Sequence, residues 1–156
     1  MAKVFLYSPQ DFHNVCLLAR TLEVFGLREC FVFDPNGLIR ERYGKVRTRE
    51  LRAVSAGAFE QIAWTRISEP EDFLRAQSGR VVATVASPAA VSLERFAFAA
   101  TDLLLFGSES RGLPEAVVAA STAAVTIASR GKTQSLNLAV AVGIVLFEWQ
   151  RQVARE

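Results

Sequence analysis

Two loops in the second half of the 156-residue chain carry most of the residues whose types suggest chemistry. The first reads G-S-E-S-R-G at positions 107–112, and the second reads A-S-R-G-K-T-Q-S-L-N at positions 128–137. Each loop follows a short apolar run and leads into a helical pattern, which is how ligand sites form at the carboxyl ends of parallel strands. Glycines, hydroxyls, amides and free backbone N–H groups predict a site for a polar small molecule.

Several common kinds of site are excluded by what these loops lack. The first loop is not G-x-G-x-x-G and follows a late strand, so the dinucleotide fingerprint fails. Gly131-Lys132-Thr133 is the tail of a phosphate-binding loop, but the required earlier glycine is replaced by Thr126. His13 is the only histidine and no G-x-S-x-G is present, so a nucleophilic triad is not indicated. No cluster of residues has metal-ligand spacing, and we expect no metal.

The elements that must position the two loops alternate between short apolar strands and helices. We expect helices at 14–25, 49–56, 69–77 and 135–151, and strands at 3–7, 30–33, 61–65, 80–85, 103–106 and 124–127. This alternation predicts an α/β fold with a mostly parallel six-stranded sheet and helices on both faces. The chain is long enough to bury a core and no linker divides it, so we expect one domain over residues 1–156.

Composition and charge are those of an ordinary globular protein. Hydrophobic residues make up 51% and charged residues 22% of the chain, which argues against intrinsic disorder. The N-terminus lacks a secretory signal, and Cys16 and Cys30 lack metal spacing, so we expect a reduced protein in the cytoplasm. The net charge is only +2, but six cations gather between positions 40 and 52. Such a segment either binds phosphates or forms a solvated face.

The last expected helix is apolar nearly all round. Apolar residues occupy positions 136, 138, 140, 142, 144–147 and 149, and they cannot share one narrow stripe. The run is too short to cross a bilayer, which needs about 20 residues. Since the sheet of a small domain covers one side of such a helix, we predict that a second subunit covers another, in a homodimer.

Three stretches of the sequence are together similar to the motifs of one enzyme family. They are N-V-C-L-L-A-R at 14–20 with F-G behind it, F-G-S-E-S-R-G-L-P at 106–114, and Q-S-L-N-L-A-V-A at 134–141. In this order they resemble motifs one to three of the SpoU/TrmH family, RNA ribose 2'-O-methyltransferases of the SPOUT superfamily. The resemblance spans essentially the whole chain. It implies a C-terminal trefoil knot, which sequence pattern alone would argue against.

The resemblance also implies the cofactor and where it binds. S-adenosylmethionine is expected in the knot, in a bent form held largely by backbone groups at the ends of the last strands. The positions implied are Thr84, Val85, Phe106, Gly107, Glu109, Gly112, Ile127, Ser135 and Leu136. Glycines among them allow close backbone approach, and an apolar wall that includes Leu105 suits an adenine.

The catalytic residues that the resemblance implies are Arg20, Asn14, Ser135 and Asn137. The family is usually described with this arginine as the base that takes the ribose 2'-hydroxyl proton. An arginine is a poor base because its pKa lies above about 12. A second interpretation is that Arg20 clamps the nucleotide and stabilises the developing alkoxide. Asn14 either orients Arg20 or the ribose, or caps the first helix, and Glu109 is interpreted as a scaffold that holds N–H groups.

The implied substrate is RNA, either tRNA or rRNA. The residues expected to contact it are Arg20, Arg40, Arg42, Lys45, Arg47 and Arg111. With one domain, the chain resembles minimal members of the family, some of which act on tRNA. One departure is Cys16, where the family usually has glycine; its side chain either narrows the approach to the catalytic edge or packs into the core. It supports an alternative, a non-catalytic knotted RNA-binding protein, while a generic nucleotide binder lacks any phosphate fingerprint.

Overall fold

The computed structural model describes residues 1–39, 49, 52–133 and 135–153. Within them, seven strands form one sheet in the order β3-β2-β1-β6-β4-β7-β5, and all the strand pairs are parallel. The strands are β1 (Lys3–Tyr7), β2 (Glu29–Phe33), β3 (Ala63–Arg66), β4 (Val81–Thr84), β5 (Val91–Ser92), β6 (Leu103–Phe106) and β7 (Ala123–Thr126). The predicted parallel α/β sheet is confirmed, but the count of six strands is wrong. The missed strand, β5, is only two residues long and shows no pattern of its own.

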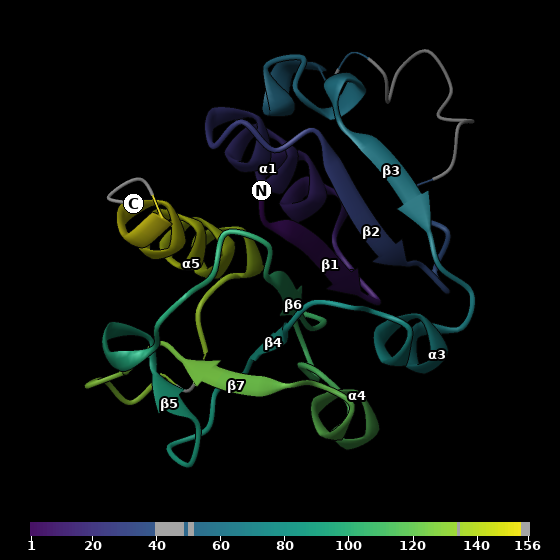
Figure 1. Cartoon of the computed structure of the whole chain (residues 1–156). Coiled ribbons are helices and arrows are strands. Elements are labelled where there is room, and N and C mark those ends of the chain that lie inside the picture. Colours follow the sequence, from purple (N-terminus) through teal and green to yellow (C-terminus); the bar gives the residue numbers. More distant parts are fainter. Residues whose placement is uncertain (40–48, 50–51, 134, 154–156) are drawn as a thin grey trace.

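Helices cover both faces of the sheet (Figure 1). They are α1 (Phe12–Val24), α3 (Pro70–Arg75), α4 (Glu115–Ala119) and α5 (Leu138–Val153), with short 3₁₀ turns η1 (Phe59–Gln61) and η2 (Leu93–Arg95). Residues 49 and 52–55 are also helical, within the helix expected at 49–56. No helix of the described residues is long and apolar enough to span a membrane.

The side chains of each strand alternate between the two faces of the sheet, so the strands contribute to a hydrophobic core on each face. Val4 and Leu6 of β1 belong to the core beneath α1 and α5. Phe5, between them, belongs to the smaller core on the opposite face, with residues of α3 and α4. Since all the strands point the same way, the loops that follow β1, β4, β6 and β7 meet at one edge of the sheet.

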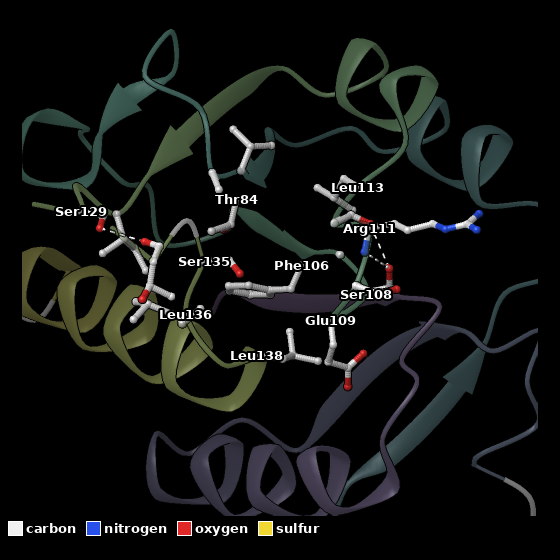
Figure 2. A pocket seen from close by; sticks show the side chains of 18 of the residues that line it. Thr84, Phe106, Ser108, Glu109, Arg111, Leu113, Ser129, Ser135, Leu136 and Leu138 are labelled. Carbon is white, nitrogen blue, oxygen red and sulfur yellow. Dashed lines mark hydrogen bonds between the residues drawn. The ribbon is translucent and has the colours of Figure 1, made fainter. Parts of the chain in front are cut away.

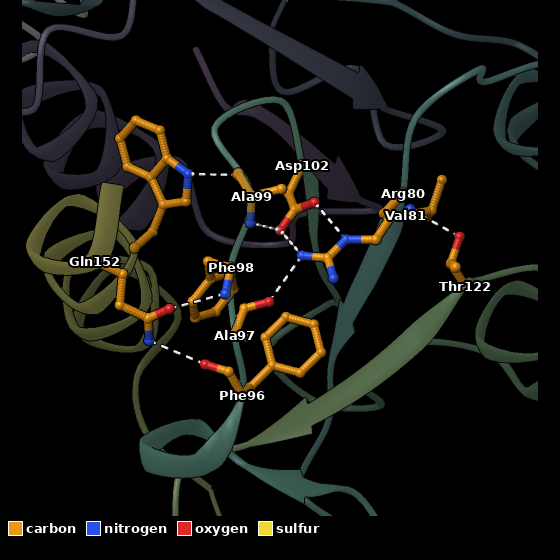
Figure 3. Close-up of polar contacts among 10 residues, drawn as sticks. Arg80, Val81, Phe96, Ala97, Phe98, Ala99, Asp102, Thr122 and Gln152 are labelled. Carbon is orange, nitrogen blue, oxygen red and sulfur yellow. Dashed lines mark hydrogen bonds and ion pairs between the residues drawn. The ribbon is translucent and has the colours of Figure 1, made fainter. Parts of the chain in front are cut away.

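The connection from β4 to β6 passes around β7. β5 belongs to this connection, and β7 pairs with β4 on one side and with β5 on the other. The chain then leaves β7 and forms α5, which packs against the returning arm of the connection. Trp149 Nε1 donates to the Ala99 carbonyl at 3.0 Å, and the Gln152 side chain bonds the backbone of Phe98 and Phe96 (Figure 3).

The returning arm ends at Asp102, a fully buried carboxylate next to β6. Asp102 accepts hydrogen bonds from Arg80 Nε at 2.9 Å, from Arg80 Nη2 at 2.7 Å and from the backbone N–H of Ala99 at 2.8 Å (Figure 3). Arg80 also donates to the Ala97 carbonyl at 2.9 Å. One buried carboxylate therefore fixes the arm to the start of β4 and holds it over α5.

Replacing Asp102 with alanine is expected to lower the free energy of unfolding by about 2–3 kcal/mol, because Arg80 and the Ala99 N–H lose a buried acceptor. The value is set below that of a fully buried ion pair because the Arg80 side chain is 40% exposed. Equilibrium unfolding in urea measures it. Asp72→Ala is the control, since Asp72 pairs with Arg75 at the surface, and it should cost less than about 1 kcal/mol. Equal losses in the two variants would contradict the role of Asp102.

Candidate functional site

A cavity of about 700 Å³ opens at the carboxyl edge of the sheet, a size typical of small-molecule sites. Its walls come from the ends of β4, β6 and β7 and from the segment that leads into α5 (Figure 2). The structure brings together around it all nine residues that the family resemblance implies for the cofactor: Thr84, Val85, Phe106, Gly107, Glu109, Gly112, Ile127, Ser135 and Leu136. Sequence reasoning missed further lining residues: Ser108, Ser129 and Thr133 on the same loops, and Leu138 at the start of α5.

The loop after β6 folds back tightly on itself. The backbones of Ser108 and Gly112 exchange hydrogen bonds of 3.1 and 2.9 Å. A Cβ atom at Gly107 would lie closer than 3.0 Å to the backbone of Gly112 and Leu113, and Gly112 has a φ of +66°. The close approach that these glycines allow is therefore first an approach of the loop to its own backbone.

A chain of hydrogen bonds joins the three sequence motifs. Glu109 Oε1 accepts from Asn14 Nδ2 at 3.1 Å, and Asn14 Oδ1 accepts from Asn137 Nδ2 at 2.8 Å. Glu109 also accepts from the backbone N–H groups of Gln10 and Asp11. Glu109 thus holds N–H groups, although they belong to the segment before α1 rather than to its own loop. The link places motif one beside the cavity wall.

The interpretation of Asn14 as a helix cap is wrong. The N-cap of α1 is Asp11, whose side chain accepts from the His13 N–H at 2.7 Å. Asn14 is buried inside the helix and uses its amide on Glu109 and Asn137. The asparagine that does cap a helix is Asn137, and that helix is α5. Its Oδ1 accepts from the N–H of Ala139 at 2.9 Å at the start of α5. For this reason α5 begins at Leu138, three residues later than the sequence predicted.

Arg20 lies further along α1, in a second hollow of about 390 Å³ between α1 and α5. Asn137 also lines this hollow, so the hydrogen-bonded amides lie between Arg20 and the larger cavity. Arg20 is exposed, and its guanidinium has no hydrogen bond or ion pair within the described part of the chain. It is therefore accessible to a ligand that approaches from solvent.

Thr84 is a polar residue of the cavity that lacks a partner. Its hydroxyl is the one buried side-chain polar atom without a hydrogen bond among the described residues. Leaving such a group unsatisfied costs about 1–3 kcal/mol, which a ligand with a polar group at this wall would offset. Phe106, Ile127 and Leu136 supply an apolar surface nearby. The cavity therefore suits a ligand that has both an apolar ring and polar groups.

The remaining candidate residues divide into three groups. Cys16 is 1% exposed and lines neither hollow, so its side chain packs in the interior. Burial, and secondarily the charge of Asp11, raises the pKa of its thiol to about 11. Arg111 lines the cavity, but its side chain points away from it (Figure 2). The predicted RNA contacts of the basic segment, Arg40, Arg42, Lys45 and Arg47, lie outside the described residues.

The fold is that of a parallel α/β protein in which the connection from β4 to β6 passes around β7. The cavity at the carboxyl ends of its strands has the size and lining of a small-molecule site. The sequence matches the model of the SpoU rRNA Methylase family over residues 1–147. The chain belongs to this family. The predicted family and fold class are thus confirmed, with the number of strands corrected.

Known relatives and solved structures agree with this assignment. A tRNA (cytidine(34)-2'-O)-methyltransferase of Beijerinckia indica is 33% identical over 95% of this chain and 89% of its own length. The tRNA (guanosine(18)-2'-O)-methyltransferase of Escherichia coli is 28% identical over 90% of this chain, which spans only 58% of that enzyme.

Two solved structures give the same fold. One, described as giving insights into the 2-OH methylation of C/U34 on tRNA, has a TM-score of 0.85 and 32% identity over 100% of this chain and 98% of its own. The AdoMet-bound rRNA methyltransferase of Sinorhizobium meliloti has a TM-score of 0.77 and 28% identity, over 96% of this chain and 55% of its own.

Proposed function

We propose that this protein is an S-adenosylmethionine-dependent ribose 2'-O-methyltransferase that modifies the pyrimidine at position 34 of tRNA. The target nucleotide is inferred from how much of each relative's length this chain covers. The relative named for cytidine 34 and the structure described for C/U34 match this chain over nearly their whole lengths. The relative named for guanosine 18 extends well beyond it. The alternative of a non-catalytic RNA-binding protein is not favoured, because Cys16 is buried and the relatives are named as enzymes.

The larger cavity is the proposed cofactor site. Its volume, its apolar wall and the unpartnered Thr84 hydroxyl fit a molecule that joins an adenine to an amino acid. Phe106, Ile127 and Leu136 would contact the ring, while Thr84 and the backbone near Gly107 would bond its polar groups. S-adenosylmethionine, when bound, supplies an electrophilic methyl group on a sulfonium. The AdoMet-bound family structure supports this assignment.

Arg20 is the proposed catalytic residue. The ribose 2'-oxygen must lose its proton as it takes up the methyl group. In the base interpretation the proton passes to Arg20, and in the clamp interpretation it passes to water while the guanidinium holds the nucleotide and stabilises the alkoxide. The clamp is physically the easier of the two, since arginine is charged at any working pH.

Asn14, Glu109 and Asn137 are proposed to position Arg20 rather than to react. Asn14 lies six residues before Arg20 on α1, and its amide is bonded to both of the other residues. These bonds fix α1 against the loop after β6 and against the start of α5. They would therefore set the distance between Arg20 and the methyl donor. Ser135, exposed at the cavity wall, would contact the donor or the ribose.

We further propose a cytoplasmic homodimer that forms through α5 and the adjoining part of α1. Val140, Ile144 and Phe147 recur along α5 at helical spacing and are 50%, 37% and 61% exposed. Val24 on α1 is 71% exposed and lines the same hollow as Val140. Apolar side chains gathered in this way are typical of an interface. A partner bound there would adjoin the hollow that contains Arg20.

With S-adenosylmethionine and a tRNA transcript, the purified protein is expected to place one methyl group on the 2'-oxygen of nucleotide 34. Mass spectrometry of nuclease fragments locates the modification. A transcript with a 2'-deoxynucleotide at position 34 is the control and should stay unmodified. Methylation at position 18, or of rRNA alone, would contradict the proposed target. A protein that bound RNA but no S-adenosylmethionine in calorimetry would favour the non-catalytic alternative.

Arg20→Ala is expected to lower the rate of methyl transfer by about a thousandfold, because the charge that stabilises the transition state is lost. The affinity for S-adenosylmethionine should stay within about twofold of wild type, since Arg20 lies outside the larger cavity. Single-turnover kinetics and calorimetry measure the two quantities. Arg28→Ala, an exposed arginine before β2, is the matched control. Loss of cofactor binding in Arg20→Ala would refute both proposed roles.

Phe147→Asp is expected to convert the dimer to a monomer at micromolar concentration, because it places a charge in an apolar interface. Light scattering after gel filtration measures the mass. Val91→Asp, which changes an exposed valine of β5 rather than one of α5, should remain dimeric. A wild-type protein that is monomeric under these conditions would contradict the dimer.

A further inference from the structure

Two cations stand at the rim of the larger cavity and were not among the predicted RNA contacts. After β7 the chain lines the cavity through Ser129, leaves it for three residues and returns at Thr133. The three residues between are Arg130, Gly131 and Lys132, and all of them are exposed. In the sequence they resemble only the end of a phosphate-binding loop whose required earlier glycine is missing. In the structure they project from the wall of the proposed methyl-donor site.

One side chain holds the base of this projection. Ser129 Oγ donates to the Thr133 carbonyl at 3.3 Å and accepts from the Gly131 N–H at 3.3 Å. These bonds tie the two points where the chain leaves and rejoins the cavity wall. Arg130 and Lys132 are thereby carried on a closed loop at the rim, one on each side of Gly131.

The charges at this rim are not neutralised within the described part of the chain. No ion pair or hydrogen bond joins Arg130 or Lys132 to another described residue, whereas Arg28 and Arg75 each pair with a carboxylate. Arg111, on the loop after β6, adds a third cation near this rim, although its side chain points away from the cavity. The acidic residue of that loop, Glu109, already accepts from three N–H donors. Two loops therefore contribute positive charge near this rim, and the carboxylate of Glu109 is already hydrogen bonded within the protein.

We infer that Arg130 and Lys132 bind phosphates of the RNA backbone next to the target nucleotide and so position the RNA over the cavity. A ribose that enters the cavity brings its flanking phosphodiesters to the rim, where lysine and arginine are their usual partners. Contacts of this kind carry no base information, so they should affect the affinity for RNA and not the choice of nucleotide. The inference rests on the proposed function and adds to it a second set of RNA contacts, separate from Arg20.

The test compares two double variants that each remove two positive charges. The first is Arg130→Gln with Lys132→Gln. The matched control is Arg28→Gln with Arg75→Gln, two exposed arginines that line neither hollow, before β2 and at the end of α3. The affinity for tRNA is measured over a range of KCl concentrations, the affinity for S-adenosylmethionine by calorimetry, and kcat and KM by methyl transfer.

In the first variant, Kd for tRNA should rise about tenfold at 0.1 M salt, and the slope of log Kd against log salt should fall by about two, one for each lost phosphate contact. KM for tRNA should rise with Kd, while kcat and the affinity for S-adenosylmethionine stay at wild-type values. The control variant should keep the wild-type slope. Exchanging the cations, Arg130→Lys with Lys132→Arg, keeps the charge and should keep most of the affinity.

Three results separate this inference from the proposed function. If the first variant and the control behave alike while wild type methylates tRNA, the inference is overturned and the proposed function stands. If the affinity for S-adenosylmethionine falls and the salt slope does not, the two cations hold the donor's carboxylate and the inference is again overturned. If wild type binds tRNA without methylating it, and only the first variant loses slope, the proposed function fails and the phosphate contacts stand.

Discussion

The site depends on three polar side chains that are far apart in sequence: Asn14, Glu109 and Asn137. An ionised carboxylate only accepts hydrogen bonds, so Glu109 requires the Nδ2 group of Asn14 to face it. Asn14 Oδ1 must then face Asn137, whose own oxygen is left to cap α5. Each amide has one orientation that satisfies every partner. Losing any member leaves a partly buried group unpaired, at a cost of about 1–3 kcal/mol. The loop after β6, α1 and the start of α5 are therefore held as one unit.

A carboxylate that holds neighbouring backbone in place lies near each end of β6. β6 is buried along its whole length, with Asp102 directly before it and Glu109 three residues after it. Asp102 fixes the connection that surrounds β7, and Glu109 fixes the segment before α1 to the cavity loop. Carboxylates placed in this way hold irregular backbone in position, which burial of apolar side chains alone does not do. A cavity built from loops can thus keep its shape.

The sequence predicts the strands better than the connections between them. β1 and β6 have the predicted bounds, because an apolar run ended by polar residues is a local signal. The sequence does not predict β5 because its two residues form a strand only through pairing with β7, 34 positions along the chain. Where the Cys16 side chain points, and what Asn14 does, also depend on which side of α1 faces the cavity loop. The motif does not specify that side. The residues alone predict a polar ligand at the strand ends, and it was the resemblance that specified the nine lining positions.

The placement of charge separates the two ligands that this function requires. The larger cavity is lined mostly by apolar and small polar residues, so affinity for a methyl donor would come from burial and backbone hydrogen bonds. The site is surrounded by described cations that have no charged partner among the described residues: Arg20, Arg111, Arg130 and Lys132. With a net charge of only +2, attraction of a polyanion must come from where the cations lie rather than from the total charge. Salt should therefore weaken the step in which RNA binds and leave the binding of the donor nearly unchanged.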